Sequence, residues 1–246
     1  MLQITKKIYL FKIVEVWFND SPFEVNDCDA VTFHACKNKV DTPGFSRENF
    51  TTTVIDLTHD LDAIWGNMSK SSCRYAIKRA KRDGVKIKLN ENFEEFYNIN
   101  RSFRKSKGLS AGFDTVETMR KYGTLFVTEY GGQILAGQLY VEDKNNIRWL
   151  LGASKRLEVS KEEATLIGNA NRLMIWEAIN YAKQKGLREF DMGGISDTGE
   201  NEPPDPVDAF KLSFGGRPDT KYIYRKDYSV LYKLIKRVYQ WRYSST

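Results

Sequence analysis

The stretch 147–194 constrains the fold of this chain more than any other part of the sequence. It opens with the apolar run IRWLLGAS, continues with small and apolar residues at helical spacing over 168–186, and closes with REFDMGG. This order predicts a buried strand, an amphipathic helix opened by small residues, and a second buried strand that ends in Asp191. The first amides of a helix lack intrahelical partners and attract phosphate. We therefore expect a phosphate-binding cradle at the helix start, beside the end of the first strand.

Composition and charge exclude several classes of protein. The chain has 246 residues, 41% of them hydrophobic, which suffices for one large domain or two small ones. The formal net charge of +6 equals the basic content of the acid-free segment 70–82 (KSSCRYAIKRAKR), so the basicity is local and we expect no general nucleic-acid binding. No apolar run is long enough to span a membrane. The three cysteines are an odd number without metal-ligand spacing, which favours reduced thiols, a cytoplasmic protein and no metal site.

Periodicity along the rest of the chain predicts an α+β fold. We expect a smaller strand-rich unit over 1–90 and a domain over 91–246 in which helices flank a mixed sheet. A loop is expected over 105–114, and a polar loop with the prolines 203, 204 and 206 after Asp191. Strands are predicted at 9–18, 30–34, 52–57, 85–89, 125–130, 134–142, 147–153, 188–194 and 222–225. Helices are predicted at 60–65, 69–83, 93–104, 115–122, 168–185, 207–214 and 228–242.

The last predicted helix, 228–242, is both basic and amphipathic. Its apolar residues recur on one side and its lysines and arginines lie between them. Two interpretations stay open for it: the helix docks on its own domain or on the partner in a homodimer, or it lies on an anionic membrane surface.

Four segments of the sequence resemble one enzyme family in their order and spacing. They are Ser69–Val85, Leu125–Gly152, Trp176–Gly194 and Phe210–Gly216. Together they resemble the Fem-like branch of the GNAT acyltransferases, which includes the peptidoglycan-bridge aminoacyltransferases. Within this branch, Ile167–Trp176 is more similar to N-acyltransferases that act on nucleotide-linked amino sugars in surface-polysaccharide (O-antigen, lipopolysaccharide) synthesis.

This resemblance implies a GNAT-like mixed sheet, and a transferase that uses acyl-CoA as donor. The acyl group would move by direct attack of the amine of a nucleotide-linked amino sugar. The family binds the CoA pyrophosphate at the start of the long helix, which implies a CoA site at the following residues: Leu151, Gly152, Gly168, Asn169, Ala170 and Asn171. The first position of the family's pyrophosphate motif is Thr165 here instead of Gln or Arg.

Several residues are candidates for the chemistry. Asp191 is the candidate base, with the alternative that it binds a backbone amide at the strand end. Lys211 matches a lysine of the Fem family's closing motif, which implies contact with substrate phosphate or with the tetrahedral intermediate. An amide of the strand 149–152, where the neighbouring strand diverges, is implied as the oxyanion donor. Residues expected to touch substrate are Arg74, Arg79, Tyr140 and Trp149, with Tyr140 as a proton donor to the leaving thiolate.

Two other functions remain open from the sequence. One keeps the fold but changes the donor to aminoacyl-tRNA and the acceptor to a peptidoglycan precursor. The other is a non-catalytic GNAT module within a polysaccharide assembly complex.

Overall fold

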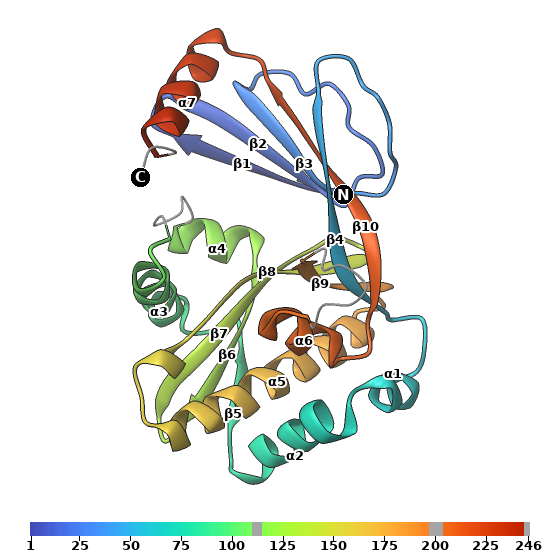
Figure 1. The fold of residues 1–246 in the computed structure, drawn as a ribbon, viewed down its shortest axis with the longest axis vertical. Coiled ribbons are helices and arrows are strands. Elements are labelled where there is room, and N and C mark those ends of the chain that lie inside the picture. The colour runs from blue at the N-terminus through green and yellow to red at the C-terminus, as the bar shows by residue number, and fades with distance from the viewer. Residues whose placement is uncertain (110–114, 197–203, 244–246) are drawn as a thin grey trace. The chain divides into compact units, whose positions relative to one another are not determined.

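The computed structural model divides the chain into two compact units, residues 1–51 with 220–246 and residues 52–219 (Figure 1). The structure describes residues 1–109, 115–196 and 204–243, with side chains as far as residue 238. Parts of the two predicted loops, 110–114 and 197–203, lie outside the described residues. Among the described helices, none has the length and apolar character that crossing a bilayer requires.

The first unit is a small sheet with one helix. Its strands are ordered β1-β2-β3-β10, with β1 antiparallel to β2, β2 parallel to β3 and β3 antiparallel to β10. The strand predicted over 9–18 begins two residues later, as β2, because Tyr9 and Leu10 make the turn of a hairpin with β1 and Tyr9 has a φ of 54° there. The elements of this unit are β1 (Leu2–Ile8), β2 (Phe11–Trp17), β3 (Ala30–Cys36), the first part of β4 (Ser46–Asp56), the last part of β10 (Arg217–Asp227) and α7 (Val230–Tyr243).

The second unit is a mixed sheet covered by helices on both faces, as the sequence predicts. Its strand order is β4-β9-β8-β7-β6-β5, and β8 and β9 are parallel whereas β5 to β8 are antiparallel. Its elements are α1 (Leu61–Asn67), η1 (Lys70–Arg74), α2 (Tyr75–Arg82), β5 (Lys86–Leu89), α3 (Phe93–Ser106), α4 (Val116–Tyr122), β6 (Thr124–Tyr130), β7 (Gln133–Glu142), β8 (Asn146–Ser154), η2 (Lys155–Leu157), α5 (Lys161–Gln184), β9 (Glu189–Ile195) and α6 (Pro206–Leu212).

The boundary between the two compact units differs from the boundary predicted at residue 90. Segment 52–90 packs with the later part of the chain: Ile77 and Ala80 of α2 share a core with Leu173 of α5. The basic helix therefore covers the central helix of the second unit, and the strand-rich unit is completed instead by the end of the chain, 220–246.

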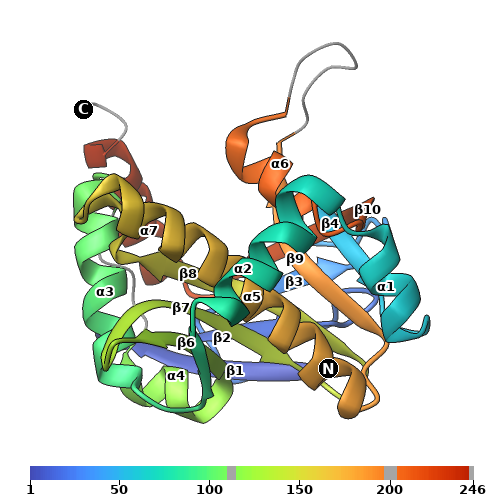
Figure 2. The same cartoon turned by 90° about the horizontal axis from the view of Figure 1, so that it is seen from below.

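Alternation along the strands of the second unit divides its core into two layers. Phe126 faces the layer beneath α5 and α2, whereas its neighbours Leu125 and Val127 face the layer beneath α3 and α4. Figures 1 and 2 show these two helix pairs on opposite faces of the sheet.

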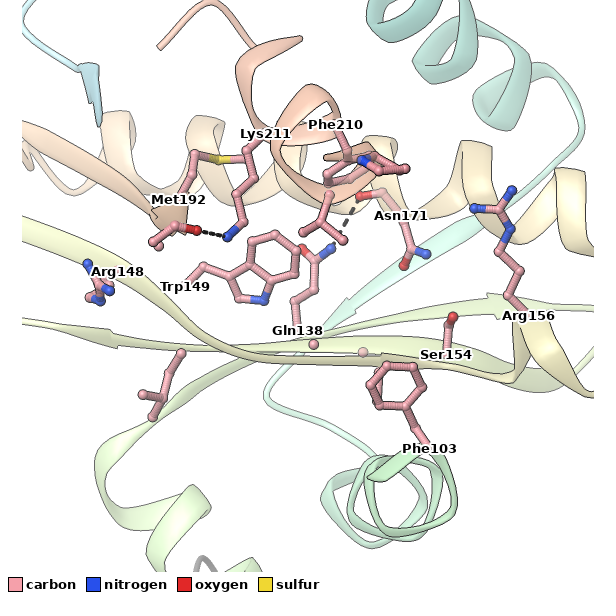
Figure 3. Close-up of a pocket in the computed structure, with 18 residues that line it drawn as sticks. Phe103, Gln138, Arg148, Trp149, Ser154, Arg156, Asn171, Met192, Phe210 and Lys211 are labelled. Atoms are coloured by element: carbon pink, nitrogen blue, oxygen red, sulfur yellow. Dashed lines mark hydrogen bonds between the residues drawn. The ribbon is translucent and has the colours of Figure 1, made fainter. Parts of the chain in front are cut away.

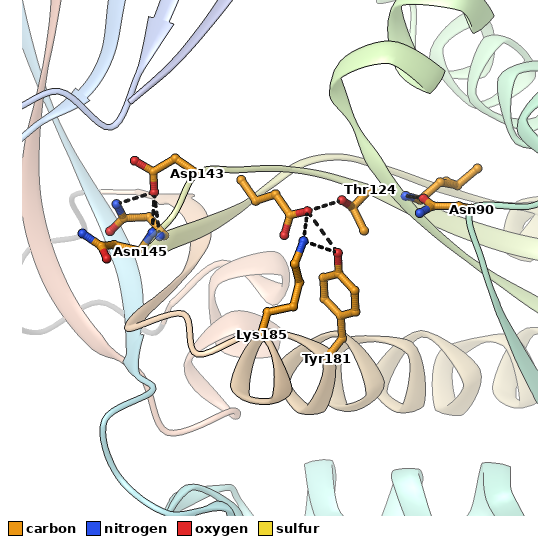
Figure 4. Close-up of polar contacts among 9 residues, drawn as sticks. Asn90, Thr124, Asp143, Asn145, Tyr181 and Lys185 are labelled. Atoms are coloured by element: carbon orange, nitrogen blue, oxygen red, sulfur yellow. Dashed lines mark hydrogen bonds and ion pairs between the residues drawn. The ribbon is translucent and has the colours of Figure 1, made fainter.

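A polar cluster ties α5 to the sheet (Figure 4). Glu142 at the end of β7 accepts hydrogen bonds from Thr124 of β6 at 2.9 Å, from Tyr181 at 3.0 Å and from Lys185 at 2.9 Å. One carboxylate thus links two strands to the C-terminal part of α5, and the opposite end of that helix is fixed separately by its own cap.

We predict that Gly215→Ala destabilises the fold. Gly215 has a φ of +76°, and a Cβ there would lie 2.5 Å from the carbonyl oxygen of Asn67. Alanine is strained at this positive φ, and its Cβ would also clash with the carbonyl oxygen. Together these effects should lower the free energy of unfolding by at least about 2 kcal/mol, measured by urea denaturation. The control is Gly66→Ala in α1, where a Cβ meets nothing within 4 Å, so stability should be unchanged or higher by up to about 1 kcal/mol. Equal stability of the two variants would contradict the prediction.

Candidate functional site

Strands β8 and β9 separate partway along their length, and a cavity opens where they part (Figure 3). They are paired from Asn146↔Glu189 to Arg148↔Asp191, and both continue beyond that point. Residues 149, 150 and 152 of β8 and residues 192–194 of β9 then line a cavity of about 560 Å³. Peptide groups on a strand that has lost its neighbour are available to a ligand. The part of β8 beyond its last pair with β9 begins at residue 149 and includes the segment 149–152, in which the oxyanion donor is implied.

The cavity is aromatic and cationic. Its aromatic lining residues are Phe103, Trp149 and Phe210. Its charged lining residues are Arg148, Arg156 and Lys211, and none of the described lining residues is an Asp or Glu. Such a lining suits a ligand that carries negative charge, phosphate above all, together with a flat or apolar part.

Lys211 reaches the point of separation from α6. This helix starts at Pro206, and the carboxylate of its N-cap Asp205 accepts a hydrogen bond from the Val207 amide at 2.8 Å. The ammonium donates to the carbonyl of Gly194 in β9 and lies 5.9 Å from the centre of the Trp149 ring. Burial lowers the pKa of Lys211, Asp208 and Asp191 oppose this shift, and Arg148 adds to it. The structure thus holds a partly desolvated ammonium at the open edge of the sheet.

Asp191 lies in the last residue pair between β8 and β9 and acts as a clamp, in that its side chain holds neighbouring strands together. Its side chain is 2% exposed and forms an ion pair with Arg148 of β8. The Thr52 hydroxyl of β4 also donates to it, as does the Gly193 amide at 2.8 Å. Both carboxylate oxygens are therefore engaged. Of the two interpretations left by the sequence, these contacts match the second, in which Asp191 binds a backbone amide, and Asp191 does not line the cavity.

The Trp149 ring depends on the absence of a side chain at Gly152. A Cβ on Gly152 would lie 2.5 Å from Cζ2 of Trp149. The indole N–H of Trp149 donates to the Leu151 carbonyl at 2.8 Å, which fixes the ring along its own strand. Gly152 and Trp149 thus shape the cavity wall together, and Leu151 itself packs into the core beneath α3.

The expected phosphate cradle is not at a helix start, and that part of the prediction is wrong. Helix α5 begins at Lys161, because Ser160 and Glu163 form a capping box in which each side chain accepts from the other's backbone. Gly168, Asn169, Ala170 and Asn171 consequently lie inside the helix, where their amides take part in its regular hydrogen bonding. Only Asn171 of the four lines the cavity; Ala170 is in the core and Asn169 faces a separate surface groove.

The other predicted substrate contacts lie away from the cavity. Tyr140 is fully buried, burial raises the pKa of its phenol, and its hydroxyl donates to Gln138 at 2.7 Å. Gln138 does line the cavity, so Tyr140 supports a lining residue. Arg79 pairs with Asp83 at 2.8 Å on the surface, and neither Arg79 nor Arg74 lines the cavity.

Sequence reasoning missed Arg148, Arg156, Gln138 and Phe210. A signal for Arg148 was present: it is the one charged residue in the apolar run 147–151, and Asp191 lies between the apolar residues Phe190 and Met192 of the adjoining strand. Opposite charges in two neighbouring buried strands indicate an ion pair. Arg156 gave no such signal, because it lies in the short turn between β8 and α5.

Comparisons with known proteins agree with this architecture. Residues 69–205 match the family model described as an acetyltransferase (GNAT) domain. The structure is similar to FemX (TM-score 0.62, 12% identity, 90% of this chain and 83% of that chain). It is also similar to L-PGS from Bacillus licheniformis (TM-score 0.57, 15% identity, 95% of this chain and 83% of that chain). A third similar structure is the C-terminal domain of a putative lysylphosphatidylglycerol synthetase from Agrobacterium fabrum (TM-score 0.55, 12% identity, 80% of this chain and 68% of that chain). At these identities the similarity shows the fold alone. No curated protein matches the sequence significantly.

We predict that Asp191→Asn lowers stability strongly. The substitution leaves the Arg148 guanidinium, 12% exposed, without its counter-charge. Removing one partner of a buried ion pair costs about 3–5 kcal/mol in the free energy of unfolding, to be measured by denaturant titration. Asp83→Asn, which removes the partner of the exposed Arg79, is the matched control and should change stability little. Similar losses in the two variants would show that Asp191 is no clamp.

Proposed function

The chain belongs to the acetyltransferase (GNAT) domain family, and on that premise we propose that it is an aminoacyl-tRNA-dependent transferase of the Fem type. The acceptor would be the amine of a peptidoglycan precursor. The observation that carries this choice of donor is the start of α5. The capping box engages the amides of Ser160 and Glu163, and Glu162 and Glu163 place negative charge in the first turn. A CoA pyrophosphate would meet these acids, whereas the cavity itself offers Arg156 and Lys211 to a phosphate.

The structural neighbours support the same donor. The putative lysylphosphatidylglycerol synthetase is named for an aminoacyl lipid product, and the similarity to L-PGS and FemX extends over 95% and 90% of this chain.

Transfer would proceed by direct attack in the cavity. The acceptor nitrogen adds to the carbonyl carbon of the aminoacyl ester, and the oxyanion that forms meets the open amides of 149–152 and the Lys211 ammonium. The C–O bond to the tRNA ribose then breaks, and the proton lost by the nitrogen ends on the leaving ribose oxygen. Asp191 holds the strand edge in place and is a positioning residue in this scheme, because both of its oxygens are already bonded.

A second candidate keeps acyl-CoA as donor and a nucleotide-linked amino sugar as acceptor. The match to an acetyltransferase domain favours it, and the cationic lining suits either phosphate-bearing substrate. Both donors are cytoplasmic molecules, which agrees with the location expected from the three free cysteines.

The experiment that separates these functions offers both substrate pairs to the purified chain. Radiolabelled aminoacyl-tRNA is combined with a nucleotide-linked peptidoglycan precursor peptide, and acetyl-CoA with nucleotide-linked amino sugars. Label transferred to the peptide, and absent with Lys211→Met but retained with Lys144→Met in an exposed turn, would support the proposal. Thiol release from CoA that requires the amino sugar would replace it by the second candidate. Turnover of neither pair would favour the non-catalytic module.

We predict that Lys211 sets the alkaline limit of the activity. A pKa lowered by burial means that this ammonium loses its proton at a lower pH than an ordinary lysine, whose pKa is about 10.4. The rate kcat/KM should therefore fall as pH rises through that lowered value, and Lys211→Arg should move the fall upward. Lys211→Met should lower kcat by roughly a hundredfold and remove the alkaline limb. An unchanged pH profile in Lys211→Met would exclude this role.

A further inference from the structure

Helix α7 carries an apolar face that is exposed to solvent. Val230, Leu231, Leu234, Ile235 and Val238 are between 47% and 70% exposed. Their spacing places them on one continuous stripe of the helix. Five large apolar side chains on one exposed stripe exceed what an ordinary surface helix shows, and such patches mark interaction sites.

The opposite side of α7 attaches the helix to its own unit. The Tyr232 ring packs edge-on against Phe11 of β2, with 5.2 Å between ring centres. The Lys236 ammonium bonds the carboxylate of Asp227 at the end of β10, 3.0 Å away. Because these two contacts hold the helix by its other side, the apolar stripe faces away from the sheet on which the helix rests.

The hairpin turn beside α7 adds to this surface. Tyr9 and Leu10 are 89% and 67% exposed, and the residue that follows them, Phe11, is the one that touches Tyr232. Figure 1 shows this end of β1 and β2 next to α7. Directly behind the turn, Lys7 and Lys12 face each other across the hairpin and are both exposed. Like charges in opposed positions destabilise a hairpin, so local stability does not explain them.

The charges indicate what this face binds. Residues 230–243 include four basic residues and no acid: Lys233, Lys236, Arg237 and Arg242. Helical geometry places Lys233 and Arg237 along one border of the apolar stripe. The nearby carboxylates are already engaged, Asp227 with Lys236 and Asp29 with the Lys12 amide at 2.8 Å. An apolar stripe bordered by cations fits the interface of a bilayer that contains anionic phospholipid.

We propose that α7 and the Tyr9–Leu10 turn form a docking face for anionic membranes. The apolar stripe and the turn would enter the acyl–headgroup boundary, and Lys233 and Arg237 would meet lipid phosphates. The proposal does not depend on which acyl donor the second unit uses. It predicts reversible attachment to the surface of a bilayer.

Co-sedimentation of the full chain with vesicles tests this face. Binding is expected with phosphatidylcholine vesicles that contain phosphatidylserine, is expected to weaken as salt rises, and is expected to be near background with phosphatidylcholine alone. Leu231→Glu with Leu234→Glu should lower the affinity at least tenfold. Lys233→Gln and Arg237→Gln should each lower it roughly fivefold. Melting temperatures confirm that the variants are folded.

Leu157→Glu is the matched control, because Leu157 is 60% exposed in η2 of the second unit and the substitution adds the same charge. Its affinity should equal that of the unchanged chain. Failure to bind either vesicle would overturn the proposal, as would equal binding of the Leu231/Leu234 variant. A dimer in sedimentation velocity that the same variant dissociates, without vesicle binding, would assign the stripe to a second copy of the chain instead.

Discussion

The ion pair between Asp191 and Arg148 lies where β8 and β9 cease to be neighbours, and the candidate site depends on it. Both side chains are nearly out of contact with solvent, and the carboxylate also binds Thr52 of β4 and the Gly193 amide. Three strands are thus joined by one side chain at one level of the sheet. Below that level the strands pair regularly, and above it they line a cavity. A buried ion pair contributes little net stability compared with apolar residues of equal volume. Its role here is to fix the level at which β8 and β9 separate.

The same pair decides the charge of the cavity. Asp191 compensates Arg148, so the net positive charge of the lining comes from Lys211 and Arg156. These two lie on different elements, α6 and the turn after β8, and approach the cavity from separate directions (Figure 3). Each of them can pair with a phosphate group of a ligand that enters the cavity.

The sequence predicts the mixed sheet, its flanking helices and the place of Asp191, because apolar periodicity and strand-end chemistry are local signals. It misplaces the start of α5, since Gly168 and Ala170 give the stronger local pattern while the capping box at Ser160 decides the helix start. It also misplaces the unit boundary, because the pairing of β3 with β10 joins segments nearly two hundred residues apart. Arg156 and Gln138 enter the site only through the tertiary arrangement of β7, β8 and α5. The spacing of residues along the sequence does not predict that arrangement.

The opening between β8 and β9 depends on two kinds of group. Peptide groups of β8 that lack a partner in β9 are present whatever side chains surround them, as long as the two strands separate at the same level. The side chains that fix this level are Asp191 and Arg148, whereas the remaining positive charge of the lining belongs to Lys211 and Arg156. The shape of the opening therefore depends on one pair of residues and its charge on another, so substitutions can change the two properties separately.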